Sequence, residues 1–104
     1  PGARNVISGN AWEGVKIEGA GTDNNQIQGN RIGTDLAGTR ALANGTQGIL
    51  LLNGASHNLI GGTSANAGNT VMGNTTDGIV VFGASTTGNS ILANSVWANG
   101  GLGL

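Results

Sequence analysis

The chain has 104 residues, of which 21 are glycine, one is proline and 9% are charged, and its formal net charge is −1. Glycine inside a helix is less favourable than alanine by about 1 kcal/mol, so this composition excludes a helical bundle. The few basic residues are scattered and form no electrostatic footprint for a nucleic acid or an anionic membrane, so neither is an expected partner.

Apolar residues nevertheless make up 38% of the chain and occur in short repeated pairs, which favours a folded domain over disorder. The length suits one domain, residues 1–104. The chain has no cysteine, which excludes a disulfide framework and thiolate metal sites. No glycine-rich stretch precedes a helical pattern with a following lysine, so no cofactor is expected. No apolar run approaches the ~18 residues of a membrane span.

Two short motifs alternate along the chain. The first is asparagine, an apolar core and a closing asparagine, as in Asn5–Asn10 (NVISGN), Asn25–Asn30 (NQIQGN), Asn69–Asn74 (NTVMGN) and Asn89–Asn94 (NSILAN), with a degenerate copy at Asn58–Gly62. The second is glycine followed by alternating apolar residues at Gly14–Ile17, Gly48–Leu51, Gly78–Val81 and Gly101–Leu104. Period-2 alternation bounded by glycine and asparagine predicts short strands between sharp turns.

The repeats fit coils of three strands each. The predicted first strands are 26–28, 59–61 and 90–92; the second strands are 6–8, 31–33, 70–72 and 95–97; the third strands are 15–18, 49–52, 79–82 and 102–104. Residues 35–47 and 62–68 are insertions between strands. The sequence therefore predicts an all-β parallel β-helix of almost four coils, in which each strand pairs with its equivalent one coil away.

One face of each strand is predicted to point into the coil. The inward set is Ile7, Val15, Ile17, Ile27, Ile32, Ile49, Leu51, Ile60, Val71, Ile79, Val81, Ile91, Val96, Leu102 and Leu104. Asparagine tolerates left-handed backbone angles, and its amide can hydrogen-bond its equivalent in the next coil. We therefore expect stacked asparagines at the corners, with Asn30 and Asn94 at one corner and Asn10, Asn74 and Asn99 at another.

The segments NVISGN, GVKIEG, NQIQGNRIGTDLAGT and ASHNLIGGT resemble the right-handed parallel β-helix repeat proteins of the pectate-lyase-like group. The resemblance covers nearly the whole chain and is specific for the fold. It implies a right-handed coil, secretion or surface display in bacteria, and frequent association with carbohydrate binding or cleavage.

An apolar strip is predicted on the outer face of the third strands. Where the first coil has Lys16 and Glu18, a surface ion pair, the next two coils place Leu50, Leu52, Val80 and Phe82 outward. Contiguous exposed apolar surface commonly marks an interface. The alternative is that insertion 35–47, with Leu36 and Leu42, folds over the strip as a lid. A ligand groove is a third interpretation.

Carbohydrate chemistry requires clustered carboxylates. Glu13 and Asp77 both precede a third strand, with Gln47 between them, and Lys16 and the two tryptophans, Trp12 and Trp97, complete the candidate carbohydrate-binding set. Solvated turn residues are the competing interpretation. His57 is the sole histidine and has no partner spacing for a triad or metal site, and no metal site is predicted.

Solenoids ordinarily need polar caps, and none is visible in the sequence. We therefore expect a segment of a longer β-helix, or copies that stack end to end. The leading interpretation is a non-enzymatic structural and interaction module of a bacterial secreted or surface protein, extracellular or at the cell surface, that self-associates through the apolar strip or the open ends. The alternative is a polysaccharide-binding or carbohydrate-active fragment, similar to a lyase or hydrolase.

Overall fold

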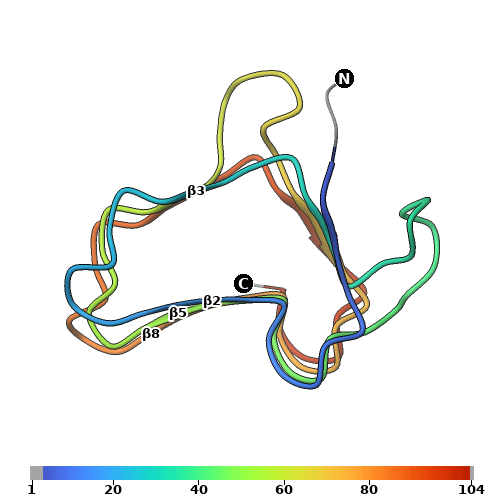
Figure 1. Ribbon diagram of the computed structural model, residues 1–104, viewed down its shortest axis with the longest axis horizontal. Coiled ribbons are helices and arrows are strands. Elements are labelled where there is room, and N and C mark those ends of the chain that lie inside the picture. Colours follow the sequence, from blue (N-terminus) through green and yellow to red (C-terminus); the bar gives the residue numbers. More distant parts are fainter. Residues whose placement is uncertain (1–3, 104) are drawn as a thin grey trace.

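The computed structural model describes residues 4–103, and in these residues the chain winds into stacked coils (Figure 1). Ten strands follow one another: β1 (Val6–Ile7), β2 (Val15–Glu18), β3 (Gln26–Ile27), β4 (Arg31–Ile32), β5 (Ile49–Leu52), β6 (Leu59–Gly61), β7 (Thr70–Met72), β8 (Ile79–Phe82), β9 (Ser90–Leu92) and β10 (Ser95–Trp97). Three strands were predicted one residue longer, and the other seven have the predicted bounds.

The strands form three sheets in the orders β1-β4-β7-β10, β2-β5-β8 and β3-β6-β9. Every pairing is parallel and joins equivalent strands of successive coils. Viewed along the stack, the three β2-β5-β8 strands superimpose along one side of the coil (Figure 1). This arrangement confirms the predicted all-β parallel β-helix.

Branched aliphatic side chains fill the interior. The buried cluster consists of Ile17, Ile32, Ile49, Leu51, Ala55, Ile60, Val71 and Ile79, and Ile7, Val15, Ile27, Ile91 and Val96 pack against it while partly exposed. All but Ala55 belong to the predicted inward set. The partly exposed members lie toward the two ends of the stack, where one neighbouring coil is lacking among residues 4–103.

The fourth copy of the glycine motif was placed in the wrong register. The backbone N–H groups of Gly78 and Ile79 donate to the carbonyls of Leu102 and Gly103 (both 2.9 Å), so Gly103 is the partner of Gly78. Leu102 therefore follows Asp77 in the stack and is 72% exposed, and residues 101–103 form no strand. The predicted inward position of Leu102 is wrong because the prediction aligned Gly101 with Gly78, whereas Gly103 occupies that place in the stack. Leu104 lies outside the described residues.

Asparagine ladders occupy three corners of the coil. One runs Asn5, Asn30, Asn69 and Asn94; the second runs Asn10, Asn44, Asn74 and Asn99; the third runs Asn25, Asn58 and Asn89. The two predicted corners are confirmed. The third was not predicted, although Asn25, Asn58 and Asn89 each open a copy of the first motif.

Candidate interaction surfaces

The outer face of β2-β5-β8 has the predicted alignment. Lys16, Leu50 and Val80 share one row, and Glu18, Leu52 and Phe82 share the next. Phe82 is 65% exposed, whereas Leu50 is buried at 8%. The predicted exposure of Leu50 is wrong because this residue lies in the middle strand, between the side chains of the coils above and below it. The exposed part of the strip is therefore Phe82 with the half-buried Leu52 and Val80.

Insertion 35–47 does not cover this strip. Its Leu42 N–H donates to the Gly33 carbonyl (2.8 Å), and a Cβ added to Gly73 would lie 2.6 Å from the Ala41 Cβ. The insertion thus packs beside β4 and β7, and it projects from a corner away from β2-β5-β8 (Figure 1). Leu36 remains 80% exposed. The lid interpretation is wrong because the apolar residues of the insertion do not reach the strip.

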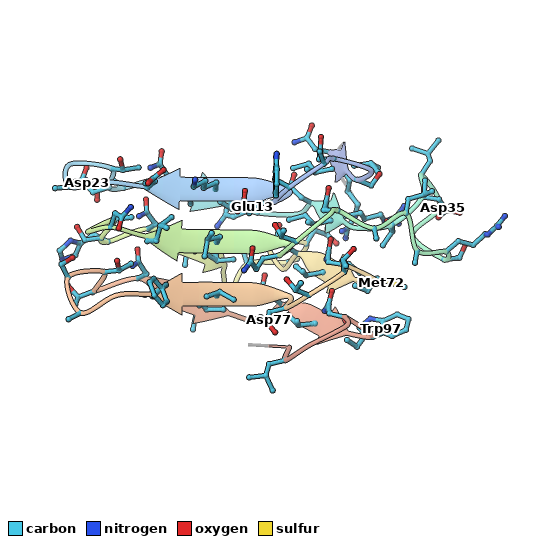
Figure 2. The ribbon with its side chains drawn as sticks, turned by 90° about the horizontal axis from the view of Figure 1, so that it is seen from below. Glu13, Asp23, Asp35, Met72, Asp77 and Trp97 are labelled. Atoms are coloured by element: carbon cyan, nitrogen blue, oxygen red, sulfur yellow. The ribbon has the colours of Figure 1, made fainter. Side chains whose placement is uncertain are left out.

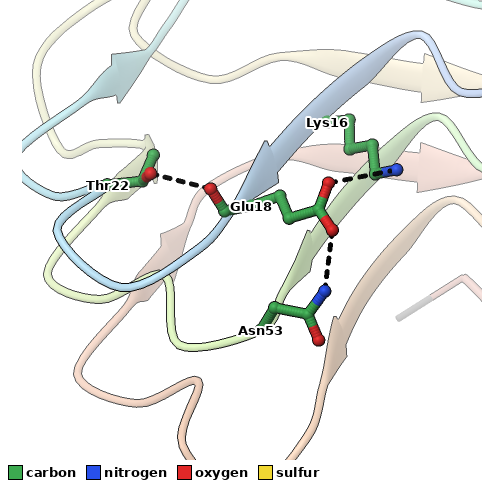
Figure 3. A network of polar contacts seen from close by, with 4 residues as sticks. All are labelled: Lys16, Glu18, Thr22 and Asn53. Atoms are coloured by element: carbon green, nitrogen blue, oxygen red, sulfur yellow. Dashed lines mark hydrogen bonds and ion pairs between the residues drawn. The ribbon is translucent and has the colours of Figure 1, made fainter.

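A polar network lies on the outer face of β2, the first strand of the same sheet (Figure 3). Lys16 Nζ lies 3.3 Å from Glu18 Oε1, and Asn53 Nδ2 donates to Glu18 Oε2 at 2.7 Å. The hydrogen bond from Asn53, followed by the contact with Lys16, lowers the pKa of Glu18. Thr22 Oγ1 donates to the Glu18 carbonyl (2.7 Å) and closes the adjacent turn. The predicted surface ion pair is confirmed. Lys16 is paired with Glu18 and not with Glu13 or Asp77.

The carboxylates of the candidate carbohydrate site are aligned but separated. Gly14 N–H donates to the Gln47 carbonyl and Gly48 N–H to the Asp77 carbonyl (both 3.1 Å), which places Glu13, Gln47 and Asp77 in successive coils. Glu13 and Asp77 are therefore two coils, roughly 9.6 Å of rise, apart. Asp77 Oδ1 also accepts the Leu102 N–H at 2.6 Å. The row is present, but within residues 4–103 no ion pair links a third charged side chain to either carboxylate.

The two tryptophans differ in their position relative to that row. Trp12 is 70% exposed in the bend before Glu13, and Trp97 is 52% exposed on β10. Figure 2 shows Trp97 beside Met72, to one side of the Glu13 and Asp77 pair. Among residues 4–103, no group of three His, Cys, Asp or Glu side chains could hold a metal ion. The structure therefore places Trp12 next to the row of carboxylates and Trp97 to one side of it.

A concave feature lies at the end of the stack, at the last coil. A hollow of about 400 Å³ is lined by Asp77, Ile79, Val80, Val81, Ile91 and Leu102. Val81 points inward as predicted, yet it is 42% exposed, because no strand follows β8 in its sheet among residues 4–103. The sequence placed Val81 in the core from its strand register alone. Its exposure follows from the position of β8 as the last described strand of its sheet. We call the hollow that it lines the end hollow.

Comparisons with protein-family models, with curated proteins and with solved structures gave no match for this chain. The similarity of its repeats to the pectate-lyase-like group therefore remains an expectation from the sequence. Within residues 4–103, no helix has the length and apolar character needed to cross a membrane.

Proposed function

We propose that this chain is a non-enzymatic structural and interaction module that self-associates through the outer strip of β2-β5-β8 or through the open end of its described coils. The observation that carries the proposal is the exposure of apolar side chains on β8, where Phe82 on the outer strip is 65% exposed and Val81 in the end hollow is 42% exposed. Burying apolar surface contributes about 25 cal/mol per Å², and an open strand edge offers backbone groups for further pairing. The resemblance of the repeats supports a bacterial secreted or surface protein as its setting.

Sedimentation velocity over a wide concentration range tests this function. We expect the mass to rise with concentration, and Val81→Lys to shift the distribution toward monomer because a charge would then occupy the hollow. Thr63→Lys is the matched control, since Thr63 is exposed in the loop between β6 and β7, across the coil from β8 (Figure 1), and it should leave the mass unchanged. A concentration-independent monomer would refute the proposal.

The outer strip is a second surface for the same function. Phe82 is 65% exposed on β8, so Phe82→Lys separates the strip from the end hollow. If the strip forms the interface, Phe82→Lys lowers the mass while Val81→Lys leaves it unchanged. If the end hollow forms it, the effects are reversed, and a lowered thermal stability without a change of mass would count against either surface.

Carbohydrate binding is the alternative function, and the specific observation in its favour is the exposure of Trp12 and Trp97. Exposed aromatic rings can stack on the apolar faces of sugars. A glycan-array screen of the wild type, Trp12→Ala and Trp97→Ala tests it. Signal on an extended glycan that disappears in either variant supports the alternative; an array without signal for the wild type removes it.

A further inference from the structure

The sequence contains three Asn-Gly pairs, Asn44-Gly45, Asn53-Gly54 and Asn99-Gly100. In such a pair the backbone nitrogen of the glycine can attack the side-chain carbonyl carbon of the asparagine, because glycine has no Cβ to hinder the approach. The attack closes a succinimide ring and releases ammonia, which is one reason why asparagine is a thermally labile residue. The surroundings of each asparagine decide whether the pair can react in the folded chain.

Two of the three pairs are held in the second asparagine ladder. Asn44 is fully buried, and its Oδ1 accepts from the backbone N and the Nδ2 of Asn10 while its Nδ2 donates to Asn74. Asn99 Oδ1 accepts from the backbone N and the Nδ2 of Asn74, and its Nδ2 donates to two backbone carbonyls. The N–H groups of the two following glycines donate to the backbone carbonyls of Asn10 and Asn74 (2.8 and 2.9 Å). Both the attacking nitrogen and the attacked amide are therefore engaged in these pairs.

Asn53 lies outside the ladders and is exposed on the outer side of the coil. Its side chain makes one hydrogen bond within residues 4–103, from Nδ2 to Glu18 Oε2 at 2.7 Å (Figure 3). Its Oδ1 accepts no hydrogen bond from these residues. The carbonyl carbon of this side chain is thus open to attack in a way that the carbonyl carbons of the ladder are not.

The nucleophile at this pair is the backbone nitrogen of Gly54. Asn53 and Gly54 have φ of +56° and +92°, and the Ala55 N–H donates to the Leu52 carbonyl (3.4 Å), as in a type I′ turn. The Gly54 N–H donates to Thr86 Oγ1 at 3.0 Å. One side-chain hydroxyl therefore holds the attacking nitrogen, and loss of that single bond frees it.

We propose that Asn53 is a deamidation site, with the backbone nitrogen of Gly54 as the nucleophile and water as the co-reactant. The bond from Gly54 N to Asn53 Cγ forms, the bond from Cγ to Nδ2 breaks, and the Gly54 proton leaves with Nδ2 as ammonia. Water then opens the ring, giving its hydroxyl to the carbonyl carbon and a hydrogen to the ring nitrogen. Opening at Cγ restores the main chain and leaves an aspartate; opening at the other carbonyl leaves an isoaspartate. The proposal is independent of self-association.

The modification changes the polar network around Glu18. The donor from Asn53 to Glu18 Oε2 is lost, and a second carboxylate takes its place beside Lys16, whose Nζ lies 3.3 Å from Glu18 Oε1. A like charge disfavours ionisation, so the modified chain should have a raised Glu18 pKa. Asn53→Asp reproduces the product with a normal main chain and is the reference for this effect.

Peptide mapping by mass spectrometry of the full chain, incubated in a mildly alkaline buffer, tests the proposal. In the folded chain Asn53 should be converted at least about tenfold faster than Asn44 or Asn99, because the ladder pairs react only after the coil opens. In urea all three should react at similar rates, since glycine follows each of them. Asn53→Gly, which suits the positive φ, should remove the fast phase of ammonia release from the folded chain.

The hydrogen bond of Thr86 provides a second readout. Thr86→Val removes the acceptor of the Gly54 N–H and should speed the conversion of Asn53 by about threefold or more, while Thr86→Ser keeps the hydroxyl and the wild-type rate. Conversion of Asn44 should stay slow in both variants, which distinguishes release of the turn from general unfolding. If folded Asn53 reacts no faster than Asn44 while all three sites react in urea, Asn53 is not a deamidation site of the folded chain. An unchanged rate in Thr86→Val refutes the role given to Thr86.

Discussion

Replacing Asn69 by alanine would remove a buried rung of the first ladder whose side-chain oxygen and nitrogen are both hydrogen-bonded. Its side chain is 1% exposed and makes four hydrogen bonds: Oδ1 accepts from N and Nδ2 of Asn30, and Nδ2 donates to Asn94 Oδ1 and to the Ile27 carbonyl. At a net value of about 1 kcal/mol for each bond, Asn69→Ala should lower the free energy of unfolding by about 4 kcal/mol. Domains typically have about 5–15 kcal/mol in total, so the loss would be large.

Urea denaturation followed by circular dichroism measures this loss. Asn53→Gly removes one exposed hydrogen bond at a residue whose φ of +56° glycine tolerates, and should change the free energy of unfolding by less than about 0.5 kcal/mol. Asn69→Asp keeps the shape of the side chain but loses both donors and turns a buried carboxylate toward Asn94 Oδ1, so it should destabilise at least as much as alanine. If Asn69→Asp is mild, or if Asn69→Ala matches the Asn53 control, packing rather than hydrogen bonding holds the corner.

Two further substitutions and a titration extend the test. Gly61 and Gly21 have φ of +91° and +87°, but a Cβ at Gly61 would collide with a carbonyl of the next coil, whereas a Cβ at Gly21 meets nothing within 4 Å. Gly61→Ala should therefore cost at least about 2 kcal/mol more than Gly21→Ala in urea denaturation, and equal costs would contradict the packing of β6. NMR titration should show that Asn53→Ala raises the pKa of Glu18, since the Asn53 hydrogen bond is the main cause of its lowering. Because the folded pKa is depressed, the contribution of Glu18 to stability is present above the unfolded value of about 4.3 and is lost as the pH falls through the folded value. An unchanged pKa in the variant would contradict this assignment.

The strand positions were predictable because each strand carries its own local signal. Short alternating segments between asparagine and glycine define both ends of a strand, and β8 (Ile79–Phe82) occupies the predicted residues. The repeat spacing then fixed which strands pair, since inward residues such as Ile32 and Val71 must align in successive coils. Local pattern and repeat register were sufficient for the fold.

The surfaces were less predictable because exposure depends on neighbours that are distant in the sequence. Leu50 and Phe82 have the same outward orientation, but Leu50 lies in the middle strand and Phe82 in the last strand of its sheet. The path of insertion 35–47 likewise depends on its contact with Gly73 and not on its apolar content. Val81 occupies an inward position but is exposed, because it lies in the last strand of its sheet and lines the end hollow.

The rungs of the first ladder are separated by 25, 39 and 25 residues, yet their hydrogen bonds have similar lengths. The extra chain between Asn30 and Asn69 leaves the coil as two loops, and the strands on either side keep their register. The corners therefore keep their positions whether the chain between them is short or long. Foreign peptides grafted in place of the loop tips, residues 36–40 or 63–66, should be displayed at defined heights along the axis, which makes this small coil a scaffold for spaced epitopes.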